Sequence, residues 1–215
     1  MQRQRRTGSA SKGQTRLYAE RLADLVPVLR SEVPAPAVAH GRPAVVVLMG
    51  PPGVGKSHCA RLLCARLTAA HVSSDHLRSR LFTAASYAPE ESATVFRAAD
   101  ALVDLLLAEG HRVVLDATNL LARNRAPVAD TAQRRRVPIV HVRVIAHERD
   151  TLGRLAERRQ ARRQGDHSDA DEAIYRKMTA FEAPEGGHLE LRNGPDLEAE
   201  SERVGQEGER CSRAS

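Results

Sequence analysis

The segment from Gly50 to Ser57 has the residue types and the spacing needed to bind the phosphates of a nucleoside triphosphate. Its sequence is GPPGVGKS, which fits the P-loop pattern G-x-x-x-x-G-K-[ST]. The three glycines can adopt positive φ and carry no side chain, so successive backbone N–H groups can converge on a phosphate where the next helix begins. The residues expected to contact the nucleotide are Gly50, Pro51, Pro52, Gly53, Val54, Gly55, Lys56, Ser57 and His58.

Lys56 and Ser57 supply the side-chain chemistry of this segment. A lysine here reaches the β- and γ-phosphates as a flexible point charge, and a serine hydroxyl here can hold Mg²⁺. The chain contains 30 arginines and only 3 lysines, and the planar fork of arginine suits bidentate contacts instead. A lysine at position 56 therefore indicates phosphate binding. The alternative is a glycine-rich turn without a ligand.

Missing motifs narrow the class of P-loop protein. A Ras-type GTPase needs an [NT]-K-x-D motif, and the other two lysines follow Ser11 and Arg176. An ATPase of the AAA or helicase type usually has a glutamate after its strand-terminal aspartate, whereas Asp116 is followed by Ala117. The compact kinases remain, in which the γ-phosphoryl group of ATP moves to an acceptor. We therefore expect ATP and Mg²⁺ as cofactors, and we do not expect hydrolysis as the main activity.

Five further segments follow the P-loop in a set order. Together with GPPGVGKS they resemble the polynucleotide-kinase-like P-loop kinases, which are related to the kinase half of polynucleotide 5′-kinases and, more distantly, to zeta toxins and gluconate kinases. The resemblance covers residues 44–191 and implies phosphoryl transfer from ATP to a hydroxyl acceptor. The five segments are SSDHLRSRLF (73–82), VVLDATNL (113–120) with Arg123 and Arg125 after it, RLAERR (154–159), SDA (168–170) and YRKMTAFEAPEG (175–186).

The resemblance implies catalytic roles for Asp75 and Arg78. The residue that matches Asp75 is the general base that accepts the proton of the acceptor hydroxyl, and the one that matches Arg78 orients the acceptor. A carboxylate and a guanidinium three residues apart on one helical turn can face the same substrate. The alternative is that Asp75 caps a helix and Arg78 is a surface arginine.

Asp116 ends the apolar run 112–116, at the edge of the sheet where ligands bind in open α/β proteins. We expect Asp116 and Ser57 to form the metal site, with the carboxylate holding a Mg²⁺-bound water or orienting the serine. The alternative is a structural carboxylate that bonds loop N–H groups. Thr118 and Asn119 either bind the acceptor or shape the loop.

An arginine-rich stretch is expected to form a helical lid over the nucleotide. Residues 149–163 contain six arginines and two acidic residues. Arg154 and Arg158 are four residues apart and share one helix face. We expect Arg154 to contact the nucleotide and Arg158 to stabilise the charge of the phosphoryl group in transfer. Arg162 extends the same face. The alternative for some of these arginines is a solvated basic surface.

No motif identifies the acceptor. The basic lid and the basic N-terminal arm favour a nucleic-acid 5′-hydroxyl, which would bind with a strong dependence on salt. Aromatic residues make up only 3% of the chain and tryptophan is absent, so a base-stacking surface is poorly supported. A small polar metabolite, such as a sugar, a nucleoside or an antibiotic, is therefore an alternative acceptor. A non-catalytic ATP-binding regulatory module is the alternative from another class.

The elements that must position these residues alternate along the chain. Apolar runs predict strands at 44–49, 71–73, 112–116, 138–145 and 188–191, and amphipathic patterns predict helices at 15–30, 58–70, 90–109, 123–136, 149–163 and 169–180. Pro27 is expected to interrupt or shorten the first of these helices. We predict an α/β fold of the P-loop NTPase type: a three-layer sandwich with a parallel sheet of about five strands and an arginine-rich helical lid.

Composition divides the 215 residues into three parts. Residues 1–43 are predicted to be a basic disordered arm with a short helix and a linker, residues 44–192 the kinase domain, and residues 193–215 an acidic disordered tail. No apolar run is long enough to cross a membrane, and the N-terminus lacks the apolar core of a secretory signal. The three cysteines form no CxxC pair, which fits a cytoplasmic protein. The oligomeric state is not indicated.

Overall fold

Five parallel strands form one sheet at the centre of the molecule. The computed structural model describes residues 21–36, 42–83, 85–162, 175–176 and 180–214. The strand order is β2-β3-β1-β4-β5, and every pairing is parallel. The strands are β1 (Val45–Met49), β2 (Ala69–Ser73), β3 (Arg112–Asp116), β4 (Ile139–Ile145) and β5 (Leu189–Arg192). The predicted five-stranded parallel sheet is confirmed.

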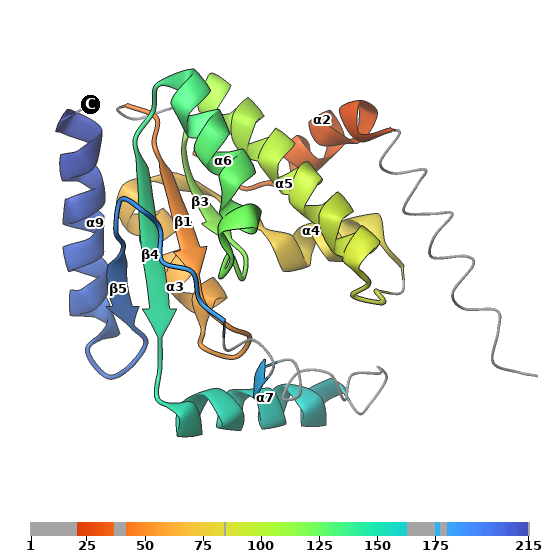
Figure 1. Ribbon diagram of the computed structural model, residues 1–215, viewed down its shortest axis with the longest axis vertical. Helices are drawn as coiled ribbons and strands as arrows, with labels where there is room; N and C mark the ends of the chain where they lie inside the picture. The colour runs from red at the N-terminus through yellow and green to blue at the C-terminus, as the bar shows by residue number, and fades with distance from the viewer. Residues whose placement is uncertain (1–20, 37–41, 84, 163–174, 177–179, 215) are drawn as a thin grey trace, which may run out of the picture.

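Helices cover both faces of this sheet and complete the three-layer sandwich (Figure 1). One face carries α5 (Pro89–Ala108), with α2 (Leu22–Glu32), α4 (Ser74–Leu81) and α6 (Ala122–Arg135) packed around it. The other face carries α3 (Lys56–Leu67) and α9 (Leu197–Ala214). The remaining helix, α7 (Glu148–Arg162), lies across the carboxyl ends of the strands (Figure 1).

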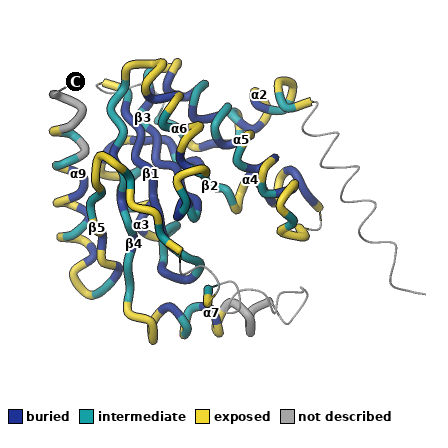
Figure 2. The backbone as a smooth tube through the Cα atoms, in the orientation of Figure 1, coloured by how far each residue is buried: buried dark blue, intermediate teal, exposed yellow. Residues whose placement is uncertain are grey.

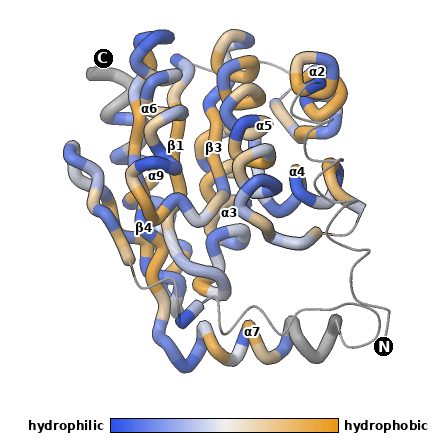
Figure 3. Tube along the Cα trace, turned by 45° about the vertical axis from the view of Figure 1, so that its right-hand side comes forward, coloured by the Kyte–Doolittle hydropathy of each residue, from blue (hydrophilic) through white to orange (hydrophobic). Residues whose placement is uncertain are grey.

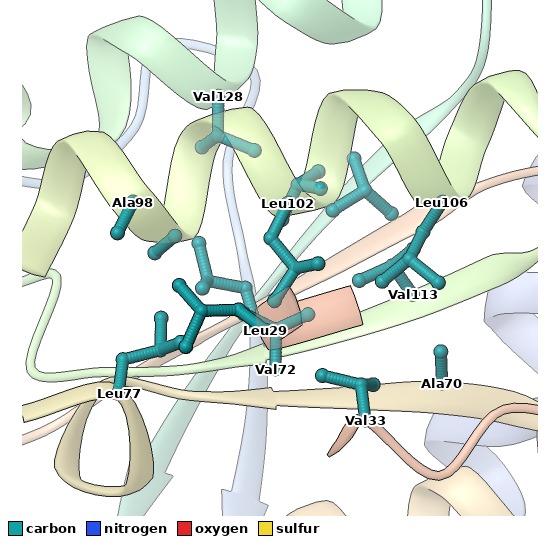
Figure 4. Packing of buried hydrophobic residues seen from close by; sticks show 14 of the residues in the cluster. Leu29, Val33, Ala70, Val72, Leu77, Ala98, Leu102, Leu106, Val113 and Val128 are labelled. Atoms are coloured by element: carbon teal, nitrogen blue, oxygen red, sulfur yellow. The ribbon is translucent and has the colours of Figure 1, made fainter. Parts of the chain in front are cut away.

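The central strand β1 is apolar throughout because both of its faces are buried. Alternate side chains enter different cores, with Val45 and Val47 in the cluster under α5 and Val46 and Leu48 in the cluster under α3. Figure 4 shows the first of these clusters, where Leu102 of α5 packs near Val72 and Val113 of the sheet. Figure 2 shows the central strands β1 and β3 as deeply buried, and Figure 3 shows their hydrophobic character. A continuous apolar run is what this doubly covered position requires.

The helix α2 belongs to the domain and not to a separate linker. It continues through Pro27 to Glu32, so the expectation that proline ends it early is wrong. Leu29 and Val33 are buried in the same core as α5, and Arg30 donates to Glu109 at 2.7 Å. This tertiary packing outweighs the local cost of the proline. The start of the predicted helix, before residue 21, lies outside the described residues.

The acidic C-terminal segment is a helix, so the prediction of a disordered tail is wrong for residues 197–214. In α9, Leu197, Ser201 and Val204 are buried. These residues recur at helical spacing and face α3, β4 and β5, and the acidic residues between them remain on the outside. The structured domain therefore extends past the predicted boundary at residue 192.

The other predicted elements agree with the structure to within a few residues. Gly110, with φ of +82°, follows the end of α5 as expected. The predicted helix at 169–180 lies outside the described residues, apart from 175, 176 and 180. In the described part of the chain, no helix combines the length and the apolar character that a membrane span requires.

Candidate active site

The P-loop connects β1 to α3 and depends on glycine at two positions. Gly53 and Gly55 have φ of +83° and +94°, a region that other residues rarely adopt. A Cβ atom on Gly53 would lie 2.8 Å from Cγ of Leu155, and one on Gly55 would overlap the side chain of Asn193. Both glycines are therefore needed for backbone conformation and for close packing. The loop ends at the first turn of α3, and the N-terminus of a helix favours an anion.

Lys56 and Ser57 begin α3, at the carboxyl edge of the sheet where Asp116 also lies. The Nζ atom of Lys56 donates to the carbonyl oxygen of Pro51 at 2.9 Å. Asp116 is only 4% exposed and accepts hydrogen bonds from the Ser57 side chain and from Nε2 of His71, the latter at 3.3 Å. Burial alone would raise the pKa of Asp116, but these two bonds and the charge of Lys56 lower it below its usual range. The carboxylate is therefore ionised at neutral pH.

Ser57 and Asp116 fit the requirements of a Mg²⁺ ion that accompanies a nucleotide. Mg²⁺ prefers oxygen ligands and usually takes one or two protein groups, with waters and phosphates completing its shell. A hydroxyl and an ionised carboxylate joined by a hydrogen bond match that pattern. The described residues contain no group of three or more His, Cys, Asp or Glu side chains that could hold a metal by themselves.

Asp75 lies on the first turn of α4, just beyond the end of β2. Ser73 is the N-cap of this helix and its side chain accepts from the backbone N–H of His76 at 3.4 Å. The alternative in which Asp75 caps the helix is therefore wrong. Asp75 is exposed, and no side-chain hydrogen bond or ion pair occupies its carboxylate within the described residues. Ser73 pairs with Asp116 in the sheet, so Asp75 follows the strand at the same carboxyl edge as Asp116.

Arg78 is buried, so the alternative of a surface arginine is also wrong. Its Nη1 donates to Oε1 of Glu91 at 2.6 Å, and its Cζ lies 4.6 Å from the centre of the Tyr87 ring. Glu91 is fully buried and also accepts from the backbone N–H and the hydroxyl of Ser86. The Nε atom of Arg78 is buried, and no hydrogen-bond acceptor among the described residues reaches it. Sequence reasoning missed Glu91, because only the fold brings α5 beside α4.

The lid helix α7 rests on the P-loop through its first half. Thr151 and Leu155 pack against Gly53. Nη1 of Arg154 lies 3.4 Å from the carbonyl oxygen of Gly53 and 3.5 Å from that of Val54. The structure thus places Arg154 beside the predicted nucleotide-binding loop. The side chains of Arg158 and Arg162 lie outside the described residues.

Two asparagines hold the loops around the site. Nδ2 of Asn193 donates to the carbonyl oxygen of Val54 at 2.8 Å, which ties the end of β5 to the P-loop. Asn119 is fully buried with φ of +46°, and its Nδ2 donates to the carbonyl oxygen of Leu48 at 2.9 Å. Arg125 in turn donates to the carbonyl oxygen of Asn119 at 2.7 Å. Asn119 therefore shapes the loop, which was one of its two expected roles. Asn193 and His71 were missed, since neither belongs to a recognisable motif.

Comparisons with known proteins agree with this architecture. Residues 45–184 match a protein family described as an AAA domain. The APS kinase CysC of Mycobacterium tuberculosis, in complex with AMPPNP and APS, has a TM-score of 0.59 and 22% identity, covering 77% of this chain and 96% of that chain.

Two further structures share the fold. Kti12 of Chaetomium thermophilum, in complex with ADP-AlF3, has a TM-score of 0.59 and 22% identity, covering 78% of this chain and 98% of that chain. A gluconokinase from Sinorhizobium meliloti 1021 has a TM-score of 0.55 and 16% identity, covering 82% and 99%. The search of curated proteins found no match.

Proposed function

We propose that this chain, which belongs to the AAA-domain family matched by residues 45–184, is an ATP-dependent phosphotransferase. Its fold, shared with P-loop kinases, supports this proposal. One observation carries this proposal. At the carboxyl edge of the sheet, the P-loop follows β1, the ionised Asp116 ends β3, and the exposed Asp75 follows two residues after Ser73, which pairs with Asp116. The P-loop and Asp116 suit a nucleotide with Mg²⁺, and Asp75 suits a hydroxyl acceptor.

The nucleotide half of the site binds and orients the triphosphate. The backbone N–H groups of the P-loop and the start of α3 receive the phosphates, and Lys56 leaves Pro51 to contact the β- and γ-phosphates. Mg²⁺, held by Ser57 and Asp116, would supply positive charge between those phosphates. The closeness of Arg154 to the P-loop supports a role in nucleotide binding. We propose that Arg158 stabilises the equatorial oxygens of the phosphoryl group in transfer.

The acceptor half of the site removes a proton. The oxygen of the acceptor hydroxyl attacks the γ-phosphorus, the bond from that phosphorus to the bridging oxygen breaks, and ADP leaves. The carboxylate of Asp75 accepts the hydroxyl proton as the new bond forms. We propose that Arg78 acts on the same side, since its guanidinium lies 4.6 Å from the centre of the Tyr87 ring, and Tyr87 is 47% exposed.

Among hydroxyl acceptors we place a nucleic-acid 5′-hydroxyl first. The segments shared with polynucleotide-kinase-like enzymes support it, as does the net charge of +6 on the chain. A sugar or another small polyol is the second candidate. This second candidate is supported by the low aromatic content of 3%, because few aromatic side chains are present to stack on the bases of a nucleic acid.

A transfer assay with γ-labelled ATP tests both candidates. The chain is incubated with Mg²⁺, labelled ATP and either 5′-hydroxyl oligonucleotides or a panel of sugars and nucleosides. We expect label on one acceptor class, no nucleotide binding by Lys56→Ala, and a loss of about 10²- to 10⁴-fold in transfer rate for Asp75→Asn with nucleotide binding unchanged. Label found only in inorganic phosphate would contradict the phosphotransferase assignment. An unchanged rate for Asp75→Asn would remove Asp75 as the base.

A further inference from the structure

The imidazole of His71 contacts the carboxylate assigned to the metal site. His71 lies on β2, and its Nε2 is 3.3 Å from Oδ2 of Asp116 on β3. In the sheet register Ser73 is directly opposite Asp116. Side chains alternate along a strand, so His71, two residues before Ser73, points to the same face of the sheet as Asp116. That face is the one covered by α3, which carries Ser57.

The carboxylate of Asp116 determines which group donates and which accepts in its contact with His71. An ionised aspartate can only accept hydrogen bonds, whereas an imidazole can donate through an N–H, and Nε2 of His71 is the ring atom that lies 3.3 Å from Oδ2 of Asp116. The imidazole must therefore carry a proton on Nε2. Asp116 thus accepts from two donors that come from different elements, the strand β2 and the helix α3.

This arrangement restricts the rotation of the carboxylate. A carboxylate anchored by one neighbour can turn about its terminal torsion, which has a broad energy minimum. A second donor on Oδ2, provided by a strand of the same sheet, fixes that torsion. The side chain of His71 is 23% exposed and that of Asp116 only 4%, so little water competes for this bond.

We propose that His71 is a positioning residue for the Mg²⁺-binding carboxylate. Its Nε2–H holds Oδ2 of Asp116 and thereby directs the carboxylate toward Ser57 and the metal. Groups that orient a metal-binding carboxylate contribute substantially to metal affinity without touching the metal. This inference rests on the proposed function, because it requires the nucleotide to bind with Mg²⁺ at Ser57 and Asp116.

The test compares nucleotide binding with and without Mg²⁺. ADP binding to the full chain is measured by calorimetry in EDTA and then across a Mg²⁺ titration, for the wild type, His71→Ala and His71→Gln. The amide N–H of glutamine can replace the imidazole donor, whereas alanine has none. His76→Ala is the matched control, since His76 lies on the neighbouring helix α4 and its Nε2 is 3.8 Å from Oε2 of Glu32.

We expect His71→Ala to need about 10- to 100-fold more Mg²⁺ for the same tightening of ADP binding. Binding in EDTA should stay at the wild-type value, His71→Gln should recover most of the Mg²⁺ response, and His76→Ala should match the wild type. An unchanged Mg²⁺ response in His71→Ala, or an equal loss of binding in EDTA, overturns the positioning role alone. If the wild type binds ADP without any response to Mg²⁺, the metal assignment of Asp116 fails as well.

Discussion

The buried carboxylate of Glu91 connects helix α4, helix α5 and the loop between them. It accepts from Arg78 of α4 at 2.6 Å and from both the N–H and the hydroxyl of Ser86, while Arg78 stacks on Tyr87. Tyr87 has φ of +55°, a costly conformation for a tyrosine. These contacts keep the loop before α5 in a strained conformation. Strain of this kind commonly accompanies binding sites.

Glu91→Gln should destabilise the fold by about 3 to 5 kcal/mol, because it leaves the buried charge of Arg78 without a counter-charge. Urea unfolding followed by circular dichroism measures this change. Glu90→Gln is the control, since Glu90 is exposed one residue earlier on the same helix, and it should change stability by less than about 0.5 kcal/mol. Equal effects of the two substitutions would mean that the Arg78–Glu91 pair contributes nothing to stability.

Helix α5 contains a half-buried acid whose charge is unfavourable. Burial raises the pKa of Asp100 to about 7. One turn further along, hydrogen bonds from Arg135 of α6 lower the pKa of Asp104. The same helix therefore carries two carboxylates with opposite effects on stability, because Asp104 is hydrogen-bonded to an arginine whereas burial dominates the environment of Asp100.

The raised pKa of Asp100 predicts a specific dependence of stability on pH. Since the folded state holds this proton more tightly than the unfolded state, stability falls as pH rises from about 4 to about 7 and then stays level. Asp100→Asn has no such penalty, so it should be more stable than the wild type at pH 8, on the order of 1 to 3 kcal/mol. The gain should nearly vanish at pH 4.

The matched control for this prediction is Asp104→Asn, which should lower stability at pH 8 by breaking the bonds to Arg135. Denaturant unfolding at several pH values provides the measurement for both variants. A gain for Asp100→Asn that is the same at pH 4 and pH 8 would show that the charge of Asp100 is not its source.

On the scale of the whole molecule, the C-terminal helix α9 completes the domain. It covers α3 and the β5 edge of the sheet, with Leu197 and Val204 in the core that lies under the P-loop helix. Asn193, between β5 and α9, bonds to the P-loop carbonyl of Val54. The segment that closes the second face of the sheet thus also supports the nucleotide-binding loop.

Substitutions on α9 test this role. Leu197→Ala and Val204→Ala should each cost about 2 kcal/mol or more, because they leave cavities in a packed core, and thermal unfolding should occur at a correspondingly lower temperature. Glu202→Ala, at an exposed position of the same helix, should leave the unfolding temperature within about 2 °C of the wild type. Unchanged stability of Val204→Ala would show that α9 does not pack on α3 in solution.

The sequence alone determined the P-loop, the parallel sheet and the residues at its carboxyl edge. These features depend on short stretches of sequence. The P-loop is recognised from the fixed spacing of the residues in GPPGVGKS, and a strand buried on both faces from a continuous apolar run. Asp116 is found because it is the last residue of such a strand. Their prediction required no knowledge of which segments meet.

Only the tertiary structure showed which groups Arg78, His71, Asn193 and α9 contact. Arg78 meets Glu91, and His71 meets Asp116, through the packing of α5 on α4 and through the register of β2 on β3. The charged composition of residues 197–214 indicated disorder, but burial of a few apolar residues on one face was enough to order the helix. Contacts between distant segments depend on the free energy of packing the whole chain, which cannot be predicted from a local sequence pattern.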